Sequence, residues 1–195
     1  MNQSYDLIPF YLQFSSIWLY TNNYHKSCYT VKGLLMIGVS GSGKTTWVNL
    51  NKQYIACSTD SILEEKAQKM GISYTEAFDY FQDKKKFESI TAAFFQSIRQ
   101  CIKNDTDFVI DRTHLKRHIR MSLINELKTI AMEHGKHLEL NAICFELPNN
   151  IIFERLNIRA KATGKIIPKN VILDQINSFD IPTIDEGFDT IERIT

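Results

Sequence analysis

Residues 38–47 read GVSGSGKTTW, a stretch in which a lysine and two threonines follow three glycines at fixed spacing. It fits the pattern G-x-x-x-x-G-K-[ST], a loop whose backbone N–H groups surround the phosphates of a nucleotide. The glycines let the backbone approach phosphate oxygens closely, and the helix that follows adds its positive end. The residues expected to contact the nucleotide are Gly38, Ser40, Gly41, Ser42, Gly43, Lys44, Thr45 and Thr46.

Two side chains of this loop have chemistry of their own. Lys44 would reach the β- and γ-phosphates of ATP or GTP, and the hydroxyl of Thr45 would bind Mg²⁺. A glycine turn without a ligand gives no reason for the Lys-Thr pair. The motif therefore predicts nucleotide binding, but it leaves the recipient of the phosphate open.

Asp60 follows a short apolar segment, residues 54–58, that is expected to form a strand. Ligands of open parallel sheets bind beyond the carboxyl ends of the strands, so Asp60 is expected near the phosphate loop. A carboxylate there could take the proton of an acceptor hydroxyl. The sequence STDS also suits a helix start, so Asp60 could instead cap the helix expected over residues 61–71.

Other charged residues lie at positions from which they could bind a phosphate or a metal ion. Asp111 ends a third expected strand and either binds Mg²⁺ through water or caps a helix, with capping favoured. Arg155 and Arg159 are four residues apart on one helical face. With Lys161 and Lys165 they form either a lid over the phosphates or a solvated basic face.

The segment 112–120, RTHLKRHIR, is a second basic cluster, formed by Arg112, Lys116, Arg117 and Arg120. These side chains could contact a phosphate backbone, but a solvated helix face is favoured. His114 and His118 lie four residues apart without a third ligand candidate, so a metal site is not expected there.

Elements of two kinds alternate along the chain, and they must position these residues. Continuous apolar runs predict strands at residues 33–39, 54–58, 107–111, 138–147 and 187–194. Helical patterns cover residues 61–71, 74–104, 115–133, 149–162 and 169–178. The alternation predicts an α/β fold with a mostly parallel, five-stranded central sheet flanked by helices.

Two of these helices carry an apolar stripe that is expected to face the core. The first stripe consists of Phe87, Ile90, Phe94, Ile98 and Cys101. The second stripe consists of Leu115, Ile119, Leu123, Leu127 and Ile130. Core packing explains both patterns without any role in binding.

Length and composition limit the number of domains and the class of protein. The chain has 195 residues, 44% of them apolar, which suits one domain. We predict this domain over residues 33–195. Residues 1–32 precede it as a poorly specified extension. The extension resembles neither a membrane span nor a signal peptide, so no membrane partner is expected. Cys28, Cys57, Cys101 and Cys144 form no metal or disulfide pattern, which favours a cytoplasmic setting. The net charge of +1 gives no global signal for nucleic acid.

Taken together, these stretches resemble the kinase domain of polynucleotide 5′-hydroxyl kinases. The resemblance runs from about residue 33 to the end of the chain. It rests on GVSGSGKTTW, on Asp60, on FVIDRTHL, on FERLNIR with its two arginines, and on SFDIPTIDEGFDTI. The phosphate loop occurs in many nucleotide-binding families, whereas the arginine spacing and the PTIDEGF ending limit the number of families that the chain can resemble. The resemblance implies a P-loop kinase fold with a helical lid.

The resemblance also implies a reaction, in which the γ-phosphate of ATP passes to the 5′-hydroxyl end of DNA or RNA. In that scheme Lys44 and Arg159 hold the transferring group, Arg155 joins them in the lid, Thr45 positions Mg²⁺ and Asp60 activates the hydroxyl. The chain lacks a D-x-D-G-T signature. A phosphatase or ligase partner for end repair would therefore sit on another chain.

The chain departs from this family on the acceptor side. The bacteriophage form has a basic residue shortly after the catalytic Asp, whereas Ser61, Ile62 and Leu63 follow Asp60 here, and Arg112 replaces a small polar or acidic residue. One alternative is therefore a kinase of the same fold that acts on a small-molecule hydroxyl. A second is a nucleotide-dependent switch or assembly ATPase, which would need no acceptor base.

Overall fold

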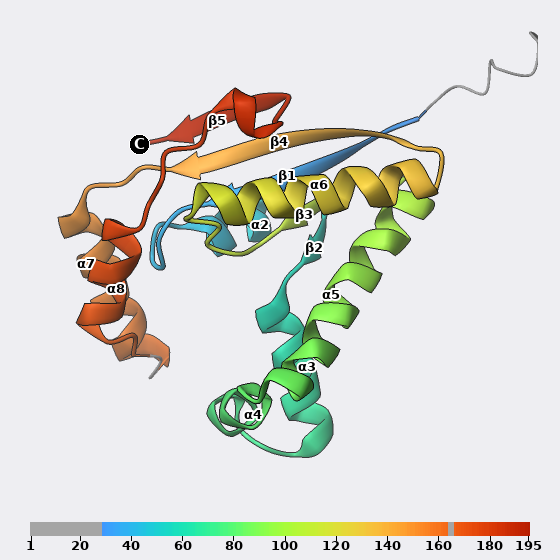
Figure 1. Cartoon of the computed structure of the whole chain (residues 1–195). Helices are drawn as coiled ribbons and strands as arrows, with labels where there is room; N and C mark the ends of the chain where they lie inside the picture. Colours follow the sequence, from blue (N-terminus) through green and yellow to red (C-terminus); the bar gives the residue numbers. More distant parts are fainter. Residues whose placement is uncertain (1–28, 164–165) are drawn as a thin grey trace, which may run out of the picture.

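A five-stranded parallel sheet forms the centre of the protein (Figure 1). The computed structural model describes residues 29–163 and 166–195. The strand order is β2-β3-β1-β4-β5, and every neighbouring pair is parallel, in agreement with the predicted fold class. The strands are β1 (Thr30–Ile37), β2 (Ile55–Cys57), β3 (Phe108–Ile110), β4 (His137–Phe145) and β5 (Thr190–Ile194).

Helices connect these strands and cover both faces of the sheet. They are α2 (Lys44–Leu50), α3 (Thr59–Met70), α4 (Tyr74–Phe81), α5 (Lys84–Lys103), α6 (Arg117–Glu133), α7 (Asn149–Thr163) and α8 (Lys169–Asn177), with a short 3₁₀ turn at Ile184–Glu186. No helix in the described ranges is both long enough and apolar enough to cross a membrane.

The first strand begins at Thr30, three residues before the predicted start. The final residues of the predicted extension therefore belong to the sheet, while residues 1–28, with Cys28, lie outside the described residues. Lys165, which was assigned to the basic lid segment, also lies outside them.

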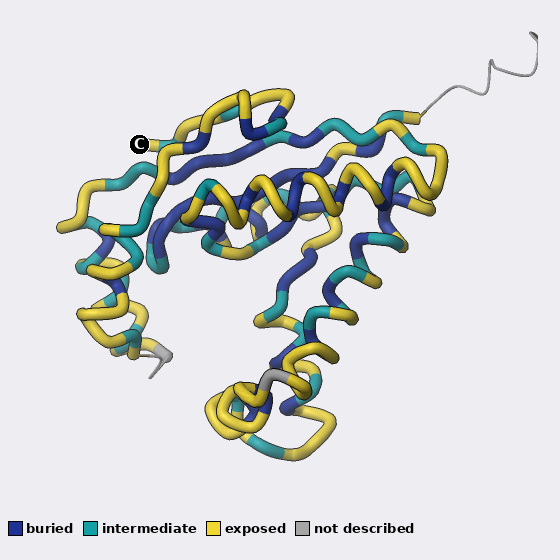
Figure 2. The backbone as a smooth tube through the Cα atoms, in the orientation of Figure 1, coloured by how far each residue is buried: buried dark blue, intermediate teal, exposed yellow. Residues whose placement is uncertain are grey.

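Strand β1 is buried on both faces, which explains its continuous apolar sequence (Figure 2). Val31, Leu35 and Ile37 pack with α5 and α6 in the larger core. Leu34 and Met36 point to the other face and pack in a smaller core that includes Val48 of α2. The phosphate loop thus leaves the sheet from its central strand, the position with the least freedom to move.

The predicted helix over residues 74–104 is two helices. Ser73 and Glu76 form a capping box at the start of α4, and the carboxylate of Asp83 caps α5 by accepting hydrogen bonds from the backbone N–H groups of Lys85 and Lys86. The chain turns at Gln82 and Asp83, between the two helices. Phe87 lies in the first turn of α5 and is 43% exposed, whereas the rest of its stripe is buried. Similarly, Ile119 on α6 is half exposed rather than buried.

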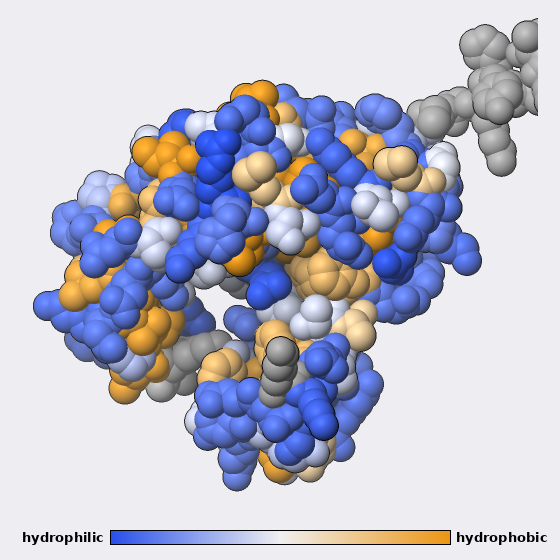
Figure 3. Space-filling view, in the orientation of Figure 1, coloured by the Kyte–Doolittle hydropathy of each residue, from blue (hydrophilic) through white to orange (hydrophobic). Residues whose placement is uncertain are grey.

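Two helical lobes extend from the carboxyl edge of the sheet. One consists of α3, α4 and the start of α5 around its own small core, which includes Leu63, Ala77 and Phe81. The other consists of α7 and α8, whose core includes Ile152 and Ile172. The space-filling view shows the surface hollowed between the two lobes (Figure 3).

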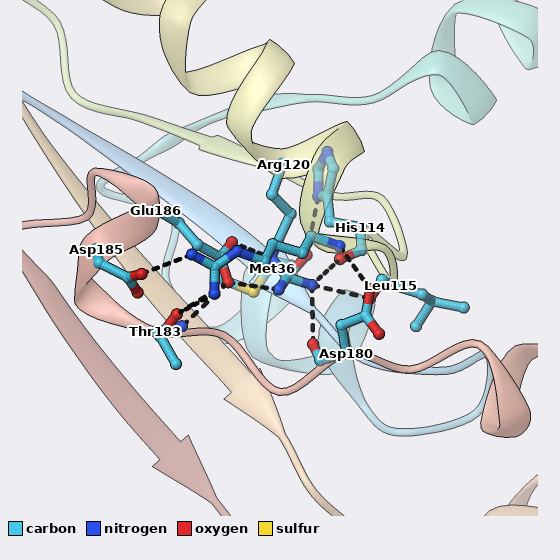
Figure 4. A network of polar contacts seen from close by, with 9 residues as sticks. Met36, His114, Leu115, Arg120, Asp180, Thr183, Asp185 and Glu186 are labelled. Carbon is cyan, nitrogen blue, oxygen red and sulfur yellow. Dashed lines mark hydrogen bonds and ion pairs between the residues drawn. The ribbon is translucent and has the colours of Figure 1, made fainter.

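A buried ion pair joins the C-terminal segment to the rest of the domain (Figure 4). The guanidinium of Arg120 donates two hydrogen bonds of 2.6 Å to the carboxylate of Glu186, and both side chains are fully buried. A third nitrogen, Nη1, donates to the carbonyl oxygens of His114, Leu115 and Asp180. The PTIDEGF ending therefore has a structural role here.

This network corrects the interpretation of residues 112–120 as a solvated helix face. Arg120 is buried, and Arg117 pairs with Asp185 at 2.6 Å and contacts Thr183. Arg112 and Lys116, by contrast, are exposed. The first turn of α6 therefore serves the fold, and only two of the four basic residues are both exposed and outside an ion pair in the described part of the chain.

The buried pair leads to a stability prediction. Glu186→Gln leaves the Arg120 charge without its carboxylate in the interior, so the free energy of unfolding in urea should fall by about 3–5 kcal/mol. Asp185→Asn, which breaks the exposed neighbouring pair, should cause a much smaller loss. Equal losses in the two variants would contradict a dominant role for the buried pair.

Candidate functional site

The phosphate loop depends on glycine at three positions. Gly38, Gly41 and Gly43 have φ angles of 152°, 83° and 106°, which other residues rarely adopt. A Cβ at Gly41 would lie 2.8 Å from the Leu156 side chain of α7. The backbone N–H of Gly38 donates to the carbonyl of Thr113, which ties the loop to the segment after β3. The loop is thus closely packed as well as sharply turned.

Lys44 folds back over this loop. Its ammonium donates to the carbonyl oxygens of Gly38 and Val39 at 2.9 and 2.8 Å and lies 3.4 Å from the hydroxyl of Ser42. Burial lowers the pKa of Lys44 to about 8, while the Asp111 carboxylate raises it, Arg159 lowers it and Asp60 raises it. The structure therefore brings Asp111, Arg159 and Asp60 within electrostatic reach of Lys44.

Thr45 and Asp111 form the oxygen-rich part of the site. The hydroxyl of Thr45 donates to the carboxylate of Asp111 at 2.9 Å, across 66 residues of sequence. Asp111 caps no helix, because the N-cap of α6 is Lys116, so the favoured capping role is wrong. A hydroxyl and a carboxylate beside a phosphate loop are the ligand types that Mg²⁺ prefers, so these two residues fit the expected metal.

Asp60 lies in the first turn of α3 but does not cap it. The N-cap is Ser58, whose hydroxyl accepts from the backbone N–H of Ser61 at 3.4 Å. Asp60 is exposed. Its carboxylate instead faces Tyr74 of α4: burial raises the pKa of Tyr74 to about 12, and the charge of Asp60 and a hydrogen bond to it add to the shift. The Tyr74 hydroxyl therefore stays a donor.

The helices of the second lobe touch the phosphate loop directly. Arg155 on α7 donates to the carbonyl of Ser42 at 3.1 Å, and Gln175 on α8 accepts from the backbone N–H of Ser40 at 2.8 Å. Arg159 lies one turn further along α7, exposed, and acts on the pKa of Lys44. Of the remaining predicted contacts, Ser42 is buried in the loop and Thr46 is exposed on α2.

Several residues of the site were missed or undervalued in the sequence. Tyr74 and Gln175 had no signal, because only the fold brings α4 to Asp60 and α8 to the phosphate loop. Asp111 did have a signal in the sequence. It ends a strand next to the central strand, and ligands of parallel sheets bind at the carboxyl edge. His114 is a buried structural residue: its Nδ1 lies 3.0 Å from the carbonyl of Met36, and burial lowers its pKa to about 4.

Comparison with protein families identifies the domain. The family model described as AAA domain matches residues 34–182, which spans the phosphate loop, Asp60, Asp111 and both arginines of α7. No curated protein matches the chain.

Solved structures share the fold at low sequence identity. A structure described as a candidate kinase from Chloroflexus aurantiacus aligns with a TM-score of 0.62 at 14% identity, covering 85% of each chain. A fungal RNA kinase aligns at 0.53 and 18% identity, covering 85% of this chain and 75% of its own. A structure of the PezAT chromosomal toxin–antitoxin system of Streptococcus pneumoniae aligns at 0.51 and 16% identity, covering 93% and 77%. At these identities the similarity shows a common P-loop kinase-like fold.

The electrostatics of Lys44 predict proton uptake when ATP binds. At about pH 8.5 much of Lys44 is neutral in the free protein, because its pKa is about 8. The charge of the phosphates favours the ammonium, so ATP binding should take up a proton, and ATP affinity should decrease as the pH rises above 8. Titration calorimetry in buffers of different ionisation enthalpy measures the uptake.

Lys44→Arg is the control for this measurement, because its guanidinium stays charged across this range. The variant should bind ATP without proton uptake. If the same uptake persists in Lys44→Arg, another group is the source.

Proposed function

The chain belongs to the AAA domain family, and from this premise we propose that it transfers the γ-phosphate of ATP to a 5′-hydroxyl end of DNA or RNA. The observation that carries this proposal is the position of Asp60. It is an exposed carboxylate at the carboxyl edge of the sheet, released from helix capping by Ser58 and within electrostatic reach of Lys44. A domain that only binds or slowly hydrolyses ATP needs no such group.

Each charged group has a task in this reaction. Lys44 and Arg159 would hold the transferring phosphoryl group, with Arg155 fixing α7 on the loop through the Ser42 carbonyl. Thr45 and Asp111 would hold Mg²⁺, which neutralises charge on the phosphates, with Asp111 acting through water.

Asp60 would accept the proton of the attacking hydroxyl. Transfer of a phosphoryl group is mostly a matter of positioning and electrostatic stabilisation, so the base needs correct placement more than a strongly shifted pKa. Tyr74 supplies placement by donating a hydrogen bond to the carboxylate. Position 2 of helix α3 adds a favourable field for the negative charge.

A nucleic acid as acceptor is supported by the fold. The fold neighbours include a fungal RNA kinase. A small-molecule hydroxyl is the competing acceptor.

The direct test offers γ-labelled ATP and Mg²⁺ together with 5′-hydroxyl DNA and RNA oligonucleotides, a 5′-phosphorylated oligonucleotide and small hydroxyl compounds. Label should reach the 5′-hydroxyl oligonucleotides and not the 5′-phosphorylated one. Transfer only to a small compound, or release only to water, would refute the proposal.

The role of Asp60 predicts a separation of activity from folding. Asp60→Asn should bind ATP with unchanged affinity and lose about 100-fold or more in kcat, the usual scale for a general base. Ser58→Ala, which removes the true helix cap, should lower the free energy of unfolding by about 1 kcal/mol and leave ATP affinity unchanged. A stability loss in Asp60→Asn that matches Ser58→Ala, with normal turnover, would assign Asp60 to the fold.

A further inference from the structure

Gln175 of α8 contacts the phosphate loop, and the proposed reaction gives it no role. Its carboxamide oxygen accepts a hydrogen bond of 2.8 Å from the backbone N–H of Ser40, across 135 residues of sequence. Bonds of this kind usually measure about 2.9–3.0 Å, so the contact is a close one. Only the oxygen of a carboxamide can accept such a bond, so the contact also fixes which way the Gln175 side chain faces.

The backbone of Gln175 is held in place by its own helix. Ile172, one turn before it, is buried in the same apolar cluster as Val39 of the phosphate loop. The hydroxyl of Ser178 donates to the backbone carbonyl of Gln175 at 3.3 Å. Helix α8 therefore meets two adjacent residues of the loop, Val39 through apolar packing and Ser40 through a hydrogen bond.

The backbone N–H groups of the loop are divided between the protein and the expected nucleotide. Three of them have acceptors in the protein: Gly38 in Thr113, Ser40 in Gln175 and Ser42 in Val39. Helix α2 starts after Gly43 without a side-chain cap, which leaves the N–H groups of its first turn available to phosphates, as the loop motif requires. Gln175 thus binds a part of the loop backbone that α2 does not hold.

This part of the backbone needs a restraint because a glycine follows it. Gly41, the residue after Ser40, has a φ of 83°, and glycine passes between such conformations and others at little cost. A rotation of the backbone at residues 40 and 41 would move the N–H groups further along the loop. Phosphoryl transfer depends on alignment, and a displacement of about 1 Å can cost about 100-fold in rate. The hydrogen bond to Gln175 opposes that rotation.

We propose that Gln175 is a positioning residue, which holds the Ser40 backbone so that the phosphate loop presents the γ-phosphate in line with the acceptor hydroxyl. The inference rests on the proposed function for the acceptor, whereas the contact itself concerns only the loop. The Ser40 N–H stays bonded to Gln175 when ATP is bound, which removes this group from those expected to contact the nucleotide. In the competing explanation the triphosphate takes the Ser40 N–H and displaces Gln175.

The first test replaces Gln175 with methionine, which has a similar length but only a weak acceptor. Gln175→Met should lower kcat for transfer of label from ATP to a 5′-hydroxyl oligonucleotide by about 10- to 100-fold. The dissociation constant of ATP, measured by titration calorimetry, should change much less, because many other groups hold the triphosphate. Displacement of Gln175 by ATP predicts the opposite pattern, in which ATP binds more tightly to Gln175→Met, and that result would overturn the inference.

Amide hydrogen exchange at Ser40, followed by NMR, measures the contact without any acceptor. In the unmodified protein the Ser40 amide should exchange slowly both with and without ATP. In Gln175→Met it should exchange about tenfold faster, because its hydrogen bond is lost. Fast exchange in the unmodified protein, or faster exchange after ATP is added, would contradict a lasting bond between Ser40 and Gln175.

Further variants separate the acceptor oxygen from the helix that carries it. Gln175→Glu keeps an oxygen at the same reach, so it should retain most of kcat, while its charge weakens ATP binding in a salt-dependent way. Ser178→Ala removes the bond to the Gln175 backbone and should lower the melting temperature with kcat unchanged. Gln100→Met, the same substitution at an exposed position of α5, should change neither kcat nor the exchange at Ser40. Gln175→Asn, one methylene shorter, serves if Gln175→Met does not fold.

The outcomes separate this inference from the proposed function. A normal kcat in Gln175→Met, or an equal loss of kcat in Ser178→Ala, overturns the inference while transfer to 5′-hydroxyl ends stands. If the unmodified protein labels no 5′-hydroxyl oligonucleotide, the proposed function fails. The exchange at Ser40 and the ATP affinity of Gln175→Met then still decide whether Gln175 fixes the loop or is displaced by ATP.

Discussion

The close approach of other elements to the backbone of residues 38–43 is the constraint on which the site depends. The loop can be approached so closely because glycine occupies the positions with positive φ and because Leu156 packs where a Cβ of residue 41 would be. Three separate parts of the chain then bind its backbone: Thr113 after β3, Arg155 on α7 and Gln175 on α8. The segment after β3 and the helices α7 and α8 therefore meet at this loop. A movement of α7 or α8 would shift the loop backbone that is expected to bind the phosphates.

Much of this arrangement was predictable, because it follows from local pattern. The continuous apolar run before GVSGSGKTTW predicts a buried parallel strand, and β1 is the central strand of a fully parallel sheet. The helix expected over residues 61–71 does end there, with Gly71 as its C-cap in the left-handed conformation. The errors came where local signals compete. The capping box at Ser73 and the cap at Asp83 outweigh the continuous helical pattern and divide the predicted helix into two.

The site was less predictable than the fold, because its decisive contacts are distant in sequence. Nothing near Arg120 indicates that its partner is Glu186, 66 residues away, so a basic stretch was interpreted as a solvated face. The same separation hides the bond between Thr45 and Asp111. Asp60 illustrates the opposite case: the segment STDS does cap a helix, but the cap is Ser58, two residues before Asp60, so the Asp60 carboxylate is not used for capping.

The net charge of +1 says little about the charge around the site, because charge in this protein is distributed locally. Arg117 and Arg120 pair with Asp185 and Glu186 and so add little net charge to the surface. Arg112 and Lys116 come from the same nine residues but remain exposed beside a pocket of about 220 Å³. Such neighbouring cations act at short range, where screening by salt is weak, whatever the sum over the whole chain. The charge of this surface therefore depends on which arginines form ion pairs within the fold. The PTIDEGF ending pairs with two of them, and in this way it helps to determine which cations stay exposed.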